Sequence, residues 1–245
     1  MLPFESNLPE PNLNPNELLT LNPAILATNL RKSVGEGDNT IEILRDLNLN
    51  VALGESVAIV GSSGSGKSTL LALLAGLDNP TTGSVNVEGL QFSSLDEDAR
   101  AAVRGKRMGF VFQSFQLLST MTALENVMLP LQLANRADAR VMAITTLEKV
   151  GLGERLTHYP KQLSGGEQQR VAIARAFAPQ PAILFADEPT GNLDINTGEC
   201  IIDLLFSLNK ASNSTLILVT HDEKLAQRCG RVLVLSHGQL SNGQL

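Results

Sequence analysis

The stretch Gly61-Ser62-Ser63-Gly64-Ser65-Gly66-Lys67-Ser68-Thr69 decides the fold of this chain. It follows the apolar run 56–60 and leads into the leucine-rich run 69–77, an order that predicts a buried strand, a glycine turn and the start of a helix. The pattern G-x-x-x-x-G-K-[ST] in that context is typical of a phosphate-binding loop. The alternative, a Gly/Ser-rich loop without a ligand, is disfavoured because both the strand and the helix flank it.

Each residue type in this loop has a physical role in binding phosphate. Gly61, Gly64 and Gly66 allow backbone conformations that a Cβ atom would block. Successive N–H groups then form a nest for phosphate oxygens, and the N-terminus of the following helix adds a positive field. Lys67 supplies a mobile charge for the β- and γ-phosphates, and the Ser68 hydroxyl is placed to bind Mg²⁺.

Composition narrows the class of protein. A chain of 245 residues suits one large domain or a domain with an inserted lobe. The net charge of −6 lacks the basic surface of a nucleic-acid binder. Cys200 and Cys229 form no metal-binding pattern and fit a reducing compartment.

No apolar run reaches the roughly 18 residues that a membrane span needs, and the first residues do not resemble a secretory signal. Any membrane contact is therefore expected to run through a partner.

The remaining patterns predict the organisation of the chain. Residues 1–23, rich in Pro, Asn and Leu, are expected to be a flexible leader. A turn is expected at 35–39 and a helical lobe at about 114–178. Short strands at 24–27, 41–53 and 85–87 indicate a small antiparallel sheet. Strands are further expected at 56–60, 108–113, 182–186 and 215–220, with a last one at 231–235, and helices at 96–104, 199–208 and 222–228. Apolar strands alternating with helices indicate a mostly parallel sheet covered on both faces.

Two acidic residues end the predicted strand Ile183-Leu184-Phe185-Ala186. Ligands of open α/β sheets bind at the carboxyl ends of strands. Asp187 is therefore expected to hold Mg²⁺ through its water shell. Glu188 is expected to orient or deprotonate a water for attack on the γ-phosphate. Both acids could instead belong to a loop or a helix cap.

A third motif, after the phosphate loop and the strand-end acids, is Leu163-Ser164-Gly165-Gly166-Glu167-Gln168-Gln169-Arg170. Ser164 and Glu167 form a capping box, which predicts a helix running to about Phe177. Gly165 and Gly166 leave the first N–H groups of that helix open to an anion. The stretch also resembles the signature motif of the ATP-binding cassette (ABC) family.

The resemblance covers nearly the whole chain from about residue 24. It implies that Gln113 is the Q-loop glutamine, which senses the γ-phosphate and Mg²⁺. It implies that Gly191-Asn192-Leu193-Asp194 is the D-loop at a dimer interface and that His221 is the switch histidine. His158 and His237 match no motif and are expected to be surface residues.

The resemblance also implies an architecture and a mechanism. Residues 24–245 would form an ABC ATPase domain: an α/β P-loop NTPase core with a mostly parallel sheet, a flanking antiparallel β subdomain and an inserted helical lobe. Two copies would pack head to tail around two ATP molecules and close when ATP binds. In that dimer, Lys67, Ser68, Asp187 and Glu188 of one copy would face Ser164 and Gly166 of the other.

The particular residues within and around these motifs suggest a subgroup of the ABC family. Residues 186–194 and 122–127 resemble ATPases of lipoprotein-release and macrolide-export systems, and residues 111–115 and 175–177 resemble the YbbA-like branch. This implies a separate integral-membrane permease with a periplasmic domain, driven in export, extraction or force transmission. It implies a peripheral place on the cytoplasmic face of the inner membrane, and a secreted thioesterase/lysophospholipase as a further partner.

Two other functions stay open at this stage. One is a soluble ABC ATPase without a membrane partner; the lack of a coiled-coil insertion and the acidic charge argue against it. The other is a regulatory module that binds ATP but barely hydrolyses it, which the intact Glu188 and His221 disfavour.

Two further features bear on binding. Val34 stands where the family usually stacks an aromatic residue on adenine, so we expect weaker and less adenine-selective binding. Phe115, Leu117, Leu118 and Met121 form an apolar cluster after Gln113. It is expected either to dock a helix of the membrane partner or to pack inside the helical lobe.

Overall fold

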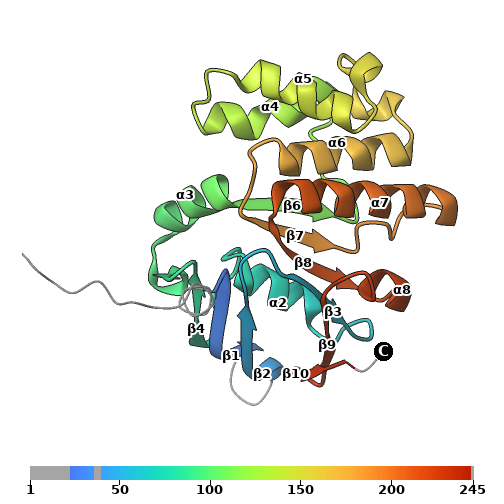
Figure 1. Ribbon diagram of the computed structural model, residues 1–245. Coiled ribbons are helices and arrows are strands. Elements are labelled where there is room, and N and C mark those ends of the chain that lie inside the picture. Colours follow the sequence, from blue (N-terminus) through green and yellow to red (C-terminus); the bar gives the residue numbers. More distant parts are fainter. Residues whose placement is uncertain (1–22, 36–39, 244–245) are drawn as a thin grey trace, which may run out of the picture.

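The computed structural model describes residues 23–35 and 40–243. Its elements form two sheets in the lower and middle part of the molecule and a helical lobe above them (Figure 1). The expected leader lies outside the described residues except for Pro23, and so does most of the expected turn at 35–39.

The first sheet is antiparallel and has the strand order β2-β1-β4-β5. Its strands are β1 (Ile25–Val34), β2 (Ile41–Val51), β4 (Thr82–Val87) and β5 (Leu90–Gln91). The predicted antiparallel sheet is confirmed, although β1 and β4 are longer than expected. The two-residue edge strand β5 was not predicted, because a strand of that length has no visible alternation.

The second sheet has the order β10-β9-β3-β8-β7-β6 and is parallel except for β10. Its strands are β3 (Ser56–Val60), β6 (Met108–Phe112), β7 (Ile183–Asp187), β8 (Thr215–Thr220), β9 (Arg231–Ser236) and β10 (Gln239–Asn242). The prediction of β9 as the last strand was wrong. Gly238, with φ 78°, turns the chain back, and the short, mostly polar β10 pairs with β9.

The parallel register brings the functional strand ends to one edge of the second sheet. Val60 lies beside Thr220, and Asp187 lies beside Val219. The segments that follow β3, β7 and β8 therefore leave the sheet at neighbouring points. Gly61, Glu188 and His221 are the residues that begin those segments.

Apolar layers cover both faces of this sheet. Helix α2 (Lys67–Leu74) packs between the two sheets, in a core that includes Ile59, Phe92 and Phe185. The 3₁₀ turn Phe92–Ser94 brings Phe92 into this layer. Helices α6 (Gly165–Phe177), α7 (Ile195–Ser212) and α8 (Glu223–Ala226) contribute to the opposite layer. Helix α6 matches its predicted bounds, whereas α7 starts earlier than expected because Asp194 caps it.

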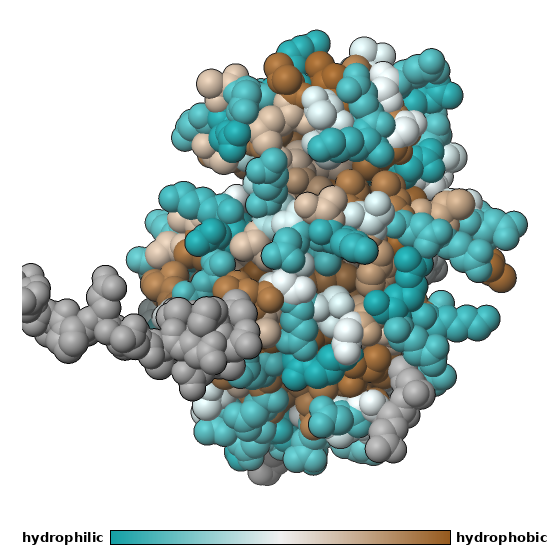
Figure 2. All heavy atoms as spheres, viewed as in Figure 1, coloured by the Kyte–Doolittle hydropathy of each residue, from teal (hydrophilic) through white to brown (hydrophobic). Residues whose placement is uncertain are grey.

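The helical lobe has a core of its own. Helices α4 (Ala123–Leu133), α5 (Ala139–Lys149) and α6 pack around Val127, Leu147 and Val171. Two 3₁₀ turns, Gly153–Arg155 and Pro160–Gln162, connect α5 to α6. The predicted capping box at Ser164 is present, and Thr122 forms a second one with Glu125. Figure 2 shows apolar patches among polar residues on the lobe at the top of the molecule.

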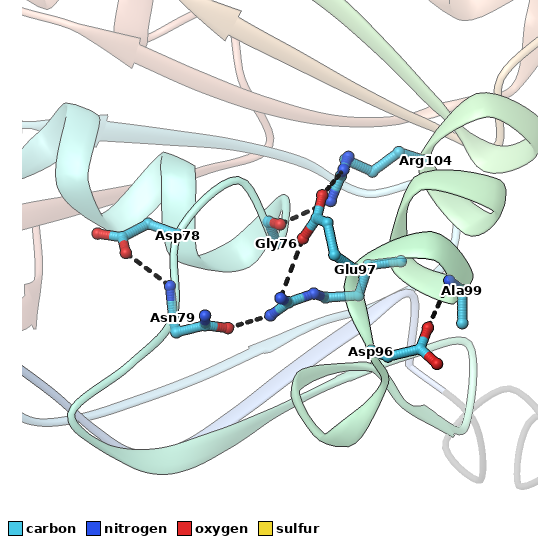
Figure 3. A network of polar contacts seen from close by, with 8 residues as sticks. Gly76, Asp78, Asn79, Asp96, Glu97, Ala99 and Arg104 are labelled. Carbon is cyan, nitrogen blue, oxygen red and sulfur yellow. Dashed lines mark hydrogen bonds and ion pairs between the residues drawn. The ribbon is translucent and has the colours of Figure 1, made fainter.

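Helix α3 (Glu97–Arg107) is tied to the loop that follows α2 (Figure 3). Arg104 Nη1 donates to the Gly76 carbonyl at 2.6 Å, and Arg100 donates to the Asn79 side chain. Glu97 pairs with both arginines. This network holds α3 against the loop that follows α2.

Candidate active site

A cavity of about 690 Å³ opens at the shared edge of the parallel strands. It gathers most of the residues predicted to bind or cleave a nucleotide. Its lining consists of Ile43, Gly61, Ser62, Ser63, Gly64, Gly66, Lys67, Ser68, Thr69, Gln113, Asp187, Glu188 and His221. Ser65 does not line it; the hydroxyl of Ser65 is buried and has no hydrogen-bond partner among the described residues.

Two glycines of the phosphate loop are required for different reasons. Gly66 is the N-cap residue of α2. Its φ of 98° is a left-handed conformation that favours glycine. Gly61 needs space rather than a special φ, since a Cβ there would lie 2.4 Å from the Leu235 carbonyl oxygen. The conformational reason predicted for Gly61 is therefore replaced by close packing against β9.

Lys67 is held at the base of the cavity. Its side chain is nearly buried, at 9% exposure, and Nζ donates to the carbonyls of Gly61 at 2.8 Å and Ser62 at 3.0 Å. The ammonium group is thus fixed by the loop itself, not mobile as its sequence context suggested. A cation positioned this way needs little ordering to meet a phosphate.

Asp187 and Ser68 form an oxygen-rich pair at the end of β7. Burial raises the pKa of the Asp187 carboxyl, and a hydrogen bond with Ser68 acts in the opposite direction. The hydroxyl, the carboxylate and the nearby Gln113 amide are the hard oxygen donors that suit Mg²⁺. The residues present therefore fit the expected ion.

Glu188 occupies an unusual backbone conformation, with φ 46°. Its N–H donates to the Val219 carbonyl at 2.9 Å, and its own carbonyl accepts from Gly191 at 3.0 Å. Its carboxylate accepts from the Thr220 hydroxyl at 3.3 Å and lies 2.8 Å from His221 Nδ1. A left-handed glutamate at a site edge is costly and persists only where its surroundings hold it, as they do here.

His221 differs from Glu188 in exposure. The side chain of His221 is 71% exposed, whereas that of Glu188 is 17% exposed. The imidazole therefore lies at the mouth of the cavity with its Nδ1 side toward Glu188. Of the other two histidines, His237 is exposed as expected. His158 is half-buried, and its Nδ1 is buried without a partner among the described residues.

Gln113 reaches the cavity from the end of β6. Its amide donates to Asn192 Oδ1 at 3.1 Å, and Asn192 Nδ2 donates back to the Gln113 carbonyl at 3.0 Å. Gly191 leaves room for this side chain, since a Cβ there would lie 2.7 Å from Gln113 Nε2 and would displace the amide. The structure thus joins the predicted Q-loop and D-loop through paired amides.

Besides Ser65, four predicted binding residues do not line this cavity: Ser164, Gly165, Gly166 and Asp194. Ser164 is exposed and its hydroxyl is engaged with Glu167 in the capping box. Gly166 packs against α7, where a Cβ would lie 2.6 Å from Thr197 Cγ2. Within one chain, the signature segment and the phosphate loop are therefore separate.

Ile43 is the cavity residue that the sequence did not indicate. It projects from β2 and lies over the phosphate loop, where a Cβ on Gly66 would be 3.1 Å from Ile43 Cγ2. Its position in an alternating strand predicts only that one face is buried. Val34, at the end of β1, is 53% exposed and does not line the cavity.

The fold and the cavity define a P-loop nucleotide-binding protein. A family model described as ABC transporter matches residues 44–191. YbbA, an ABC transporter ATP-binding protein of Escherichia coli (strain K12), is 58% identical over 213 residues, 86% of this chain and 93% of that protein. The lipoprotein-releasing system ATP-binding protein LolD of Legionella pneumophila (strain Lens) is 51% identical over 213 residues, 86% and 94% of the two chains.

Solved structures agree with this match. The dimeric, post-hydrolysis structure of the ATP-binding cassette MJ0796 with ADP and Pi has a TM-score of 0.82 and 41% identity, covering 90% of this chain and 99% of that one. The chain belongs to the ABC transporter family, and it is an ATP-binding cassette ATPase similar to YbbA and LolD.

Proposed function

We propose that this ATPase is the energy-supplying subunit of a membrane ABC complex. In this proposal it acts on the cytoplasmic face of the inner membrane and drives export, extraction or force transmission through a separate permease. The observation that carries the catalytic part is the single cavity that unites the phosphate loop with Asp187 and Glu188. The similarity to named transporter subunits supports the membrane part.

The catalytic roles follow from the positions of the side chains. Lys67 and the loop N–H groups bind the β- and γ-phosphates, and Ser68, Asp187 and Gln113 would hold Mg²⁺, which supplies charge neutralisation at the phosphates. Glu188 accepts a proton as water attacks the γ-phosphorus and the bond to the bridging oxygen breaks, leaving ADP and phosphate. His221 lies beside Glu188 at the γ-phosphate end.

The separation of the signature segment from the cavity supports a head-to-tail dimer. Ser164 is exposed and caps α6, and the N–H groups of Gly165 and Gly166 in the first turn have no intrahelical partner. In one chain these groups meet no nucleotide. A second copy would bring its own cavity to them, and the dimeric MJ0796 structures are consistent with such an arrangement.

An apolar groove of about 380 Å³ between the core and the lobe is the proposed docking site for a permease helix. Its wall includes Leu77, Phe110, Leu129 and Leu133, with Gln116 at the Q-loop side. The groove differs from the predicted apolar cluster, none of whose members lines it. Within that cluster, Leu117 packs against the lobe core, which was the alternative to docking. Leu118 is exposed.

No helix in the described part of the chain is long and apolar enough to cross a bilayer. In the proposal, a membrane partner supplies the spanning segments: a permease with a periplasmic domain. A secreted thioesterase/lysophospholipase in the same complex is the further proposed component, suggested by the YbbA-like resemblance.

Co-purification from detergent-solubilised membranes tests the permease proposal. We expect a stoichiometric integral-membrane protein to accompany the chain. Leu133→Asp, at an exposed groove position, should abolish this recovery by placing a charge on the apolar contact. Val141→Asp is the matched control, since Val141 is also exposed on the lobe but lies outside the groove.

Three outcomes are informative. Loss with Leu133→Asp and retention with Val141→Asp would support docking in the groove. A membrane partner that both variants retain would place the contact elsewhere. A homodimer without any membrane protein would favour the alternative, a soluble ABC ATPase, and leave the ATPase chemistry intact.

Val34 stands where related ATPases usually have an aromatic residue, and this difference gives a quantitative prediction for nucleotide affinity. Val34→Tyr is expected to tighten ATP binding by about 1–3 kcal/mol, roughly 5- to 150-fold in Kd, because a ring can then stack on the base. Nucleotide titration of both proteins with ATP and GTP measures the effect, with exposed Leu53→Tyr as the control. A wild-type protein that strongly prefers ATP over GTP would show that the base is recognised by other groups.

A further inference from the structure

Arg175 is a half-buried cation with no role in the site described so far. It lies on α6, close to the end of the helix at Phe177. Burial lowers the pKa of its guanidinium, and the group forms no ion pair with any residue in 23–35 or 40–243. A charge in this position is stabilised only if hydrogen bonds replace its lost water.

The guanidinium finds those hydrogen bonds on the segment that follows Gln113. Nη1 donates to the Gln116 carbonyl at 2.6 Å, and Nη2 donates to the Phe115 carbonyl at 3.0 Å. Both acceptor residues have left-handed backbones, with φ 60° at Phe115 and 49° at Gln116. Such conformations are unfavourable for side chains of this size, so an external contact is needed to hold them.

A second side chain of α6 holds the other end of the same segment. Gln169 is fully buried, and its Nε2 donates to the Pro189 carbonyl at 2.5 Å and to the Phe112 carbonyl at 3.4 Å. Gln113 therefore lies between two anchors on one helix. The same helix also begins at the signature residue Ser164.

We propose that Arg175 is a positioning residue for ATP hydrolysis: it clamps the backbone of residues 115 and 116 so that the Gln113 amide faces the γ-phosphate end of the cavity. The inference rests on the proposed role of Gln113. Arg175 acts through that residue and does not itself touch the nucleotide. Because Arg175 and Gln116 also line the apolar groove, the clamp lies between the proposed docking site and the cavity.

A double-mutant cycle on the full chain tests the clamp. We would measure ATPase kcat and ADP Kd for the wild type, Arg175→Lys, Gln113→Ala and the double variant. Lysine keeps the charge but loses the two-pronged geometry. Arg175→Lys is expected to lower kcat by about tenfold. ADP affinity should stay unchanged, because ADP lacks the phosphate that Gln113 senses. Arg136→Lys, at an exposed pair on the lobe, is the control.

The decisive comparison is the effect of Arg175→Lys in the Gln113→Ala background. If the clamp works through Gln113, Arg175→Lys should lower the kcat of the Gln113→Ala variant by less than about twofold. If Arg175 has an independent structural role, the kcat losses of the two single variants should multiply in the double variant. A multiplicative result, or an unchanged kcat in Arg175→Lys alone, would overturn the proposal. Wild-type turnover in Gln113→Ala would instead remove the role of Gln113 itself, and with it the route by which Arg175 acts.

A second substitution and the ADP affinity distinguish loss of the clamp from loss of the fold. If Arg175→Lys fails to fold, Arg175→Gln replaces it in the same cycle, because a neutral amide can donate to the loop without burying a charge. Loss of ADP binding in parallel with kcat would show general damage to the fold and would also count against the clamp.

Discussion

Replacing Glu188 with Gln is expected to lower ATP turnover by about 10²- to 10⁴-fold, the usual contribution of a general base, while ATP binding is kept. Glutamine has the same shape and still accepts a hydrogen bond from the Thr220 hydroxyl. The backbone contacts of residue 188 with Val219 and Gly191 do not involve the side chain. The substitution therefore removes the proton acceptor and leaves its surroundings in place.

With hydrolysis blocked, ATP should accumulate in the bound state and hold two copies together. Single-turnover kinetics measures the chemical step, and light scattering with excess ATP measures the dimer. Glu88→Gln is a close control, because Glu88 also has a left-handed backbone, φ 49°, but pairs with Arg107 away from the cavity. Normal turnover in the Glu188→Gln variant would assign the base to another group.

The sequence predicted the cavity well because its components depend on local pattern. A phosphate loop needs glycines and a lysine at fixed spacing, and a strand-end acid follows directly from a buried apolar run. The parallel register then places Asp187, Glu188 and His221 together without further information. Most of the strands of the central sheet were predictable for the same reason, since buried strands are continuous apolar runs.

What the sequence did not indicate depends on contacts between distant segments. Arg175 binds carbonyls 59 and 60 residues away, and backbone acceptors carry no side-chain signature. Gly61 is required by the Leu235 carbonyl of another strand. Strand β10 is short and polar, so only its pairing with β9 defines it. Such features need the tertiary structure.

Replacing Lys67 with Ala is expected to weaken nucleotide binding itself. Truncating one partner of a buried, charged hydrogen bond costs about 2–5 kcal/mol, which corresponds to roughly 30- to 5,000-fold in Kd. Lys67 is nearly buried and held by two loop carbonyls, and no other described side chain of the cavity supplies a permanent positive charge in its place. Calorimetric titration with ATP and with ADP measures the loss for each nucleotide.

The two nucleotides separate the roles of the charge. If Lys67 binds both the β- and γ-phosphates, its loss should weaken ADP binding as well as ATP binding, with the larger effect on ATP. An effect on ATP alone would confine the ammonium group to the γ-phosphate. Lys149→Ala, on the exposed surface of α5, controls for the change in net charge. Normal affinity for both nucleotides in a folded Lys67→Ala variant would contradict the phosphate-loop assignment, because no cation would then be needed where the loop places one.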